Sequence, residues 1–212
     1  MSKLNIESRV YKLTGLTPIL GSLPASKTLR AEFLATKAPT PELAEEEAVS
    51  GVDMNDRGLT VFARDNREQI CVMGYQLKGF FKAALYALSG QYKITAYKSK
   101  VDLMLFVEPR FIPLIRDGKP VMFEDDILER PLRSSGPKGD RVSLAASEQV
   151  NDPWSVEVEI TLLPPKAAAN GTKGDLLTWE VVEACLDYGA YHGLGQWRNA
   201  DYGRFLWERV EE

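Results

Sequence analysis

The sequence is poor in the residues on which many catalytic and metal sites depend. Among its 212 residues there is one histidine, His192, and there are two cysteines, Cys71 and Cys185. These counts exclude a site built on two histidines of one chain, and they are too low for a disulfide scaffold or a cysteine zinc site. Neither a G-x-x-x-x-G-K-[ST] phosphate loop nor a G-x-S-x-G nucleophile turn occurs. We therefore expect neither a metal nor a cofactor.

Long apolar runs are also absent. No stretch approaches the roughly 18 apolar residues that a membrane span needs, and residues 1–13 lack the apolar segment of a secretory signal. With 44% hydrophobic and 26% charged residues, the composition is that of an ordinary globular protein with a buried core. The expected location is the cytoplasm, without membrane contact.

Hydropathy periodicity predicts an alternation of strands and helices. The clearest helix carries an apolar stripe from Leu77 to Leu88, and a second begins at Thr178, whose hydroxyl can cap it. A hairpin is expected around residues 65–68. Alternating apolar residues predict four strands, at residues 4–13, 101–107, 154–162 and 204–210.

The order strand, helix, strand, strand, helix, strand predicts an α+β fold. In its ferredoxin-like (split βαβ) form, a four-stranded antiparallel sheet carries two helices on one face. We expect one domain over residues 1–212, with insertions at about 15–73 and 109–150. Phe80, Phe81 and Trp154 are expected in the core, and both cysteines are expected to be inert.

Charge is unevenly distributed along the chain. The total is −4, from 26 basic and 30 acidic residues, yet residues 40–56 carry six acidic side chains and no basic one. Residues 76–116 have a net charge of +5, and residues 130–141 have +3, from Arg130, Arg133, Lys138 and Arg141 against Asp140. We expect residues 130–141 to form a mobile basic loop. Such a chain can follow a phosphate backbone with one face, or stack head to tail on a copy of itself.

The most unusual segment interleaves glycine, arginine and aromatic residues over positions 193–205. Backbone N–H groups in a glycine-rich loop can bind phosphate oxygens, as can the guanidinium groups of Arg198 and Arg204. Trp197 and Tyr202 offer flat surfaces for base stacking. In the alternative interpretation, this is a tight turn whose aromatic residues cap the core and whose arginines pair with acidic neighbours, Asp201 or Glu208.

A resemblance to a known family rests mainly on this segment. The pattern from Gly193 through Gly195 to Arg198, followed by Gly-Arg-Phe at 203–205, resembles the glycine-rich loop of the RAMP superfamily, the ferredoxin-like RNA-binding subunits of CRISPR effector complexes. It is also similar to the C-terminal string of small phage proteins. Residues 13–20, LTGLTPIL, and 74–82, GYQLKGFFK, resemble the first strand and helix of that family. The resemblance covers about a third of the chain.

This resemblance implies RNA binding and filament-like self-assembly, in the bacterial host cytoplasm if the protein is phage-encoded. It also implies that Lys78 and Lys82 face the nucleic acid. The predicted binding residues are Lys78, Lys82, Arg130, Arg133, Lys138, Arg141, Gly193, Gly195, Trp197, Arg198, Tyr202 and Arg204.

Several functions remain open at this point. The first is a non-catalytic protein that binds single-stranded RNA or DNA, as a homo-oligomer or beside CRISPR effector subunits. The second is a metal-independent ribonuclease that uses His192 as general acid or base. The third is a phage-encoded interaction module that mimics or blocks a CRISPR effector subunit. A metal-dependent enzyme using the three acidic residues at 124–126 is a fourth.

Overall fold

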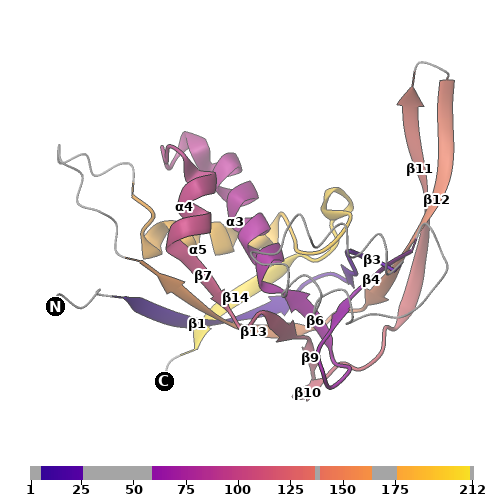
Figure 1. Ribbon diagram of the computed structural model, residues 1–212, viewed down its shortest axis with the longest axis horizontal. Helices are drawn as coiled ribbons and strands as arrows, with labels where there is room; N and C mark the ends of the chain where they lie inside the picture. The colour runs from indigo at the N-terminus through magenta and orange to yellow at the C-terminus, as the bar shows by residue number, and fades with distance from the viewer. Residues whose placement is uncertain (1–5, 26–58, 137–138, 164–175, 211–212) are drawn as a thin grey trace.

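The computed structural model describes residues 6–25, 59–136, 139–163 and 176–210; in strand residues 132–136 and 139–144 it describes the backbone only. Figure 1 shows the arrangement of the elements. The helices are α3 (Gly74–Ala87), α4 (Tyr97–Met104) and α5 (Trp179–Asp187), with short 3₁₀ turns at Leu88–Gly90, Tyr188–Ala190 and Arg198–Ala200. The strands are β1 (Glu7–Gly15), β2 (Ile19–Leu20), β3 (Leu23–Pro24), β4 (Leu59–Val61), β5 (Ala63–Arg64), β6 (Ile70–Met73), β7 (Leu105–Glu108), β8 (Phe111–Pro113), β9 (Ile115–Arg116), β10 (Lys119–Pro120), β11 (Asp126–Gly136), β12 (Gly139–Val150), β13 (Ser155–Leu162) and β14 (Phe205–Val210).

The largest sheet is antiparallel and lies at the centre of the molecule. Its strand order is β10-β9-β13-β1-β14. On the side of β13 away from β1, β9 pairs at Ser155 and β7 pairs with residues 159–162. Tyr11 in β1 lies opposite Val158 in β13 on one side and Arg209 in β14 on the other. The predicted α+β class is confirmed, as are the predicted strands around residues 4–13, 154–162 and 204–210.

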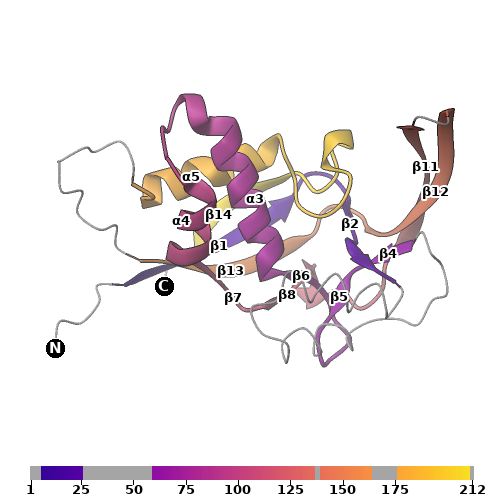
Figure 2. The ribbon, with the colours of Figure 1, turned by 45° about the horizontal axis from the view of Figure 1, so that its top comes forward.

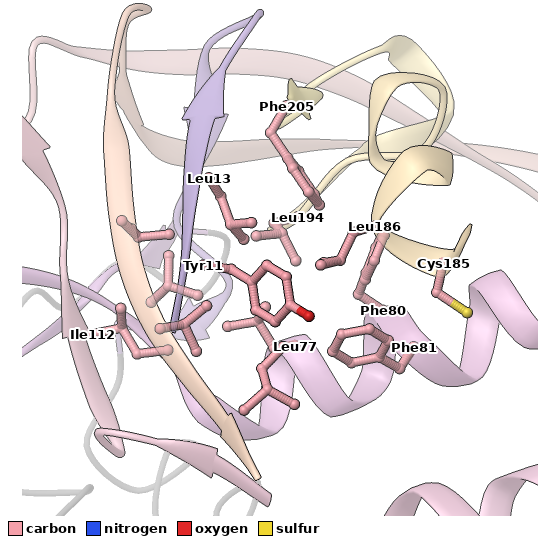
Figure 3. Close-up of a cluster of buried hydrophobic side chains, with 14 of the residues drawn as sticks. Tyr11, Leu13, Leu77, Phe80, Phe81, Ile112, Cys185, Leu186, Leu194 and Phe205 are labelled. Atoms are coloured by element: carbon pink, nitrogen blue, oxygen red, sulfur yellow. The ribbon is translucent and has the colours of Figure 1, made fainter. Parts of the chain in front are cut away.

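Helices α3, α4 and α5 cover one face of this sheet (Figure 2). The apolar stripe of α3 is buried as predicted, with Phe80 and Phe81 at 0% and 1% exposure. Trp154 is also buried, and burial raises the pKa values of Cys71 and Cys185 to about 12, so that both thiols stay protonated and inert. Figure 3 shows this core between sheet and helices.

A second sheet joins two segments that are far apart in the sequence. Its order is β11-β12-β4-β3, with β2 paired to β12. Strands β2 to β4 come from the first predicted insertion, and β11 and β12 come from the second. A third sheet, β5-β6-β8, contains the predicted hairpin, in which Ala63 pairs with Cys71.

Two predictions about local structure were wrong. Residues 101–104 belong to α4, and only residues 105–108 form a strand. Val101 and Leu105 are both buried and lie four apart, which fits a helical turn as well as an alternating strand.

The expected mobile loop at 130–141 is instead part of the long hairpin β11–β12, which projects beyond the helices (Figure 1). Pro131 favoured the loop interpretation because proline cannot donate to a strand ladder. It is tolerated here because β11 is the edge strand of its sheet.

None of the helices in the described ranges is long and apolar enough to cross a membrane.

Candidate nucleic-acid interface

The glycine-rich loop between α5 and β14 packs tightly against its own protein. A Cβ atom at Gly203, whose φ is +72°, would lie 2.0 Å from the carbonyl oxygen of Leu194. One at Gly195, with φ +79°, would lie 2.5 Å from the carbonyl oxygen of Leu20. These glycines therefore admit a close backbone approach, but the approaching backbone is the chain's own.

Hydrogen bonds and a buried leucine hold this loop in place. The backbone N–H of Gly203 donates to Pro18 at 2.7 Å, and that of Leu16 donates to Arg204 at 2.7 Å. Leu194 points into the core near Phe205 (Figure 3). The loop is a fixed platform on the connection between β1 and β2.

Trp197 and Tyr202 form the outer surface of this platform. Their rings are stacked, with centroids 5.4 Å apart and planes inclined by 14°. Trp197 is 40% exposed and has φ +52°, a left-handed conformation that non-glycine residues rarely adopt. Asp201, at the other end of the 3₁₀ turn, also has a positive φ. The backbone of the loop is therefore strained at two non-glycine residues, next to the aromatic pair that it holds.

Arg130 of β11 reaches this aromatic pair from the hairpin. Its guanidinium carbon lies 4.8 Å from the centroid of the Trp197 ring, within cation–π range. One amino group donates to the hydroxyl of Ser147 at 3.1 Å, and that hydroxyl is 2.7 Å from the hydroxyl of Thr60. The fold therefore joins the predicted basic segment and the predicted aromatic loop. Nothing in the local sequence around Ser147 identifies it as the residue that orients Arg130.

Arg198 and His192 lie near each other and near Tyr188. Burial lowers the pKa of Arg198, whose main electrostatic neighbour is Tyr188. His192 stacks on Tyr188 with ring centroids 5.4 Å apart, and burial, with a smaller effect of Arg198, lowers its pKa. Its Nε2 is buried and has no hydrogen-bond partner within the described residues. A general acid or base must reach the proton that it transfers, which the buried Nε2 does not, although the His192 side chain as a whole is only half-buried.

Arg204 is occupied by contacts within the protein. Its Nε donates to the carbonyl oxygen of Ala190 at 2.7 Å, and its backbone N–H donates to the hydroxyl of Thr17 at 3.0 Å. Asp201 lies 3.9 Å from the guanidinium. For Arg204 the turn interpretation describes the observed contacts better than a free phosphate ligand does.

Lys78 and Lys82 both contact α4. Lys82 forms a 2.6 Å ion pair with Asp102, and Lys78 lies 3.3 Å from the Asp102 carbonyl oxygen and 5.1 Å from the Phe106 ring centroid. In both views of the ribbon, α4 and the glycine-rich loop lie on opposite sides of α3 (Figures 1 and 2). The fold does not bring these lysines to the loop.

Two of the remaining predicted basic residues, Arg133 and Arg141, belong to the far part of the hairpin. Arg133 pairs with Val142 and Arg141 pairs with Ser134 in the backbone register. Lys138 lies outside the described residues. The backbone thus places Arg133 and Arg141 farther along the same hairpin as Arg130.

The acidic residues 124–126 do not form a metal site. Glu124 accepts from Arg64, and Asp125 is held by Arg116 and by the backbone N–H of Asn151. No group of three metal-ligating side chains occurs among the residues that the structure describes.

The face of the central sheet opposite the helices is acidic. Alternation along the strands places Glu108, Glu157, Glu159 and Glu208 there with a single lysine, Lys12. Glu108 and Glu159 lie directly opposite each other, a pairing that destabilises a sheet. A phosphate backbone would be repelled from this face.

No protein-family model matches the chain, and no curated protein matches it. Chains of solved structures do match. One is from the cryo-electron microscopy structure of the type III-B Cmr-beta bound to cognate target RNA, with a TM-score of 0.41 and 8% identity. The match covers 97% of this chain and 60% of that chain, so the protein spans less than two thirds of its neighbour's length. At this TM-score the likeness carries no argument.

Proposed function

We propose that this protein is a non-catalytic binder of single-stranded RNA or DNA, and that the strand runs over the junction between the β11–β12 hairpin and the glycine-rich loop. The observation that carries the proposal is the position of Arg130 over Trp197. It joins a basic segment to an aromatic pair in which Trp197 is exposed and Tyr202 is half-buried. Stacking surfaces beside positive charge are what sequence-tolerant single-strand binders use.

The proposed scaffold is a ferredoxin-like, RAMP-like unit. Its support is the strand order β7-β13-β1-β14, with α3 following β1 and α5 following β13 along the chain. The second sheet and the hairpin would then be insertions into a single domain. Head-to-tail homo-oligomers and CRISPR effector subunits as partners are proposals that follow from the sequence resemblance.

Two observations support this path. The acidic face of the central sheet, opposite the helices, would repel the phosphates of a strand. Lys78 and Lys82 are turned toward Asp102 on α4, away from the loop. The sequence of the hairpin segment contains four basic residues, Arg130, Arg133, Lys138 and Arg141. Through Arg130, the hairpin contacts the Trp197 ring. We therefore place the strand along the hairpin and across the loop.

Fluorescence anisotropy with labelled single-stranded RNA, single-stranded DNA and duplex DNA at several salt concentrations tests this function. The expected result is tight, salt-sensitive binding of single strands and weaker binding of duplex. Absence of binding to all three at low salt would contradict the proposal.

A matched pair of triple variants tests the location. Replacing Arg133, Lys138 and Arg141 by Gln should lower the slope of log affinity against log salt by roughly 2, since each phosphate contact on a single strand contributes about 0.7. The control replaces three exposed basic residues elsewhere, Arg67, Lys93 and Lys98, by Gln. Equal losses in both variants would indicate binding without a defined path.

The acidic sheet face supports a second candidate, a protein-interaction module. The opposed pair of Glu108 and Glu159 is kept without a basic partner among the described residues, which suits contact with a basic protein surface. This candidate predicts copurification of host effector subunits without nucleic acid. The same anisotropy series separates it from the first, because it predicts no binding of any strand.

A further inference from the structure

Arg130 carries a positive charge that the described part of the protein leaves without an acidic partner. It is 7% exposed, makes one hydrogen bond, to Ser147, and its buried Nε has no partner within the described residues. Arg64 is equally buried, at 7%, but it bonds to both Glu124 and Glu148. The two arginines are therefore equally buried, but among the described residues only Arg64 has acidic partners that balance its charge.

Among the described residues no acidic group compensates the charge of Arg130; a buried charge in that state lowers stability, and burial lowers the pKa of Arg130. An apolar side chain of similar volume, such as methionine, would serve the fold better at this position. The arginine is explained if an anion supplies the missing charge. A positive charge in a poorly solvated place attracts an anion strongly, because water screens it little.

The surface next to this charge fixes the rest of the ligand. Trp197 covers the guanidinium and is itself 40% exposed, and Tyr202 stacks on it at 5.4 Å. An aromatic pair beside a cation, with Trp197 exposed and Tyr202 half-buried, suits a ligand with an aromatic group and a negative charge. A nucleotide has both, in its base and its phosphate.

We infer that the junction of Arg130, Trp197 and Tyr202 is a subsite for one nucleotide, with the base stacked on the aromatic pair and the phosphate attracted by Arg130. This inference rests on the proposed function and sharpens it: binding energy is concentrated in one nucleotide per chain. The nucleotide can be part of a strand or a free mononucleotide, and the two sources share the same chemistry.

Calorimetric titrations with adenosine 5′-monophosphate, adenosine and a single-stranded oligonucleotide test the subsite. The variants are Arg130→Gln, with Arg67→Gln as a control of equal charge change at an exposed site, and Trp197→Ala, with Trp197→Phe as a stacking control. We expect one mononucleotide per chain, bound more tightly than adenosine, and loss of that preference in Arg130→Gln. Trp197→Ala should weaken oligonucleotide binding by roughly five- to a hundredfold, and Trp197→Phe by less.

The thermal unfolding midpoint of Arg130→Gln separates a binding role from a structural one. The inference predicts an unchanged or raised midpoint together with weaker binding. A lowered midpoint with unchanged binding would overturn it, and so would equal affinity of the wild-type protein for adenosine and its monophosphate.

The oligonucleotide arm distinguishes the two sources and the two proposals. If the mononucleotide does not bind but Arg130→Gln and Trp197→Ala weaken oligonucleotide binding, the subsite takes its nucleotide from a strand. If the oligonucleotide binds and neither variant matters, the subsite is wrong while the proposed function stands. If the wild-type protein binds no oligonucleotide, the proposed function itself fails.

Discussion

The guanidinium of Arg130 lies 4.8 Å from the centre of the Trp197 ring, although the two residues belong to a hairpin and a loop that are far apart in the sequence. The contact is supported from both sides. Ser147 holds the guanidinium, and the backbone bonds of the glycine-rich loop fix the ring. This pair is a contact between the projecting hairpin and the loop after α5.

Two glycine substitutions should have opposite effects on stability. Gly203→Ala places a Cβ atom 2.0 Å from the Leu194 carbonyl oxygen at a residue with φ +72°. We therefore expect the free energy of unfolding to fall by about 1–3 kcal/mol. Gly79→Ala, inside α3 with nothing within 4 Å of the new Cβ, should raise it by about 0.5–1 kcal/mol. Urea unfolding measures both. A neutral Gly203→Ala would mean that the loop is not packed as described.

Replacing Arg204 should lower the stability of the fold, whereas replacing Arg198 should not. Arg204→Ala removes the bond from Nε to Ala190, and we expect a loss of about 1.5 kcal/mol, at the low end for a charged donor because the side chain is partly exposed. Arg198→Ala removes a half-buried charge whose pKa burial lowers, and it should leave the unfolding midpoint unchanged or raise it. Equal destabilisation by both would contradict the assigned contacts.

Stability should rise with pH through the titration range of His192. Burial places the pKa of His192 in the folded protein below its ordinary value of 6.5. Between the folded and unfolded pKa values the unfolded chain binds more protons, so the free energy of unfolding increases as the pH rises toward 6.5 and this contribution is lost as the pH falls.

Replacing the imidazole by a side chain that does not titrate tests this linkage. His192→Gln should flatten the increase measured by urea unfolding between about pH 5 and pH 7.5. An identical pH dependence in both proteins would show that the imidazole environment is not as described. Nucleic-acid binding by His192→Gln should be unchanged near pH 7.5.

The lysines of α3 should contribute little to nucleic-acid binding. Lys82→Gln breaks the ion pair between Lys82 and Asp102, whose side chains are 30% and 52% exposed, respectively. Its effect on the free energy of unfolding should therefore stay below about 1 kcal/mol. Because both lysines contact α4, which lies on the opposite side of α3 from the glycine-rich loop, we expect the affinity for single strands to change less than in Arg130→Gln. The anisotropy assay decides between them, and a larger loss in Lys82→Gln would move the path across α3.

Sequence patterns predicted the elements whose burial is periodic. The stripe of α3 and the alternation of β13 depend on neighbours in the chain, and both were confirmed. The hairpin was missed because Pro131 and the glycines near its tip indicate a loop, and only the edge position of β11 makes the proline compatible with a strand. The strand prediction for residues 101–104 was wrong because the spacing of Val101 and Leu105 fits both the helical and the strand period.

For the candidate interface, the residue types could be predicted but not their grouping. Trp197, Tyr202 and Arg130 were identified separately, whereas their stacking is a tertiary contact that leaves no local pattern. The same holds for Lys82 and Asp102, whose pairing depends on the angle between α3 and α4. The acidic face of the sheet also appears only once the register brings Glu108 opposite Glu159.

Photo-crosslinking of a single-stranded RNA containing 4-thiouridine, mapped by mass spectrometry, tests the central claim most directly. We predict crosslinks at Trp197 and Tyr202 and along the β11–β12 hairpin, and their loss at Trp197 in the Arg130→Gln variant. Crosslinks confined to the open sheet face, at Phe106 or Leu206, would contradict the account.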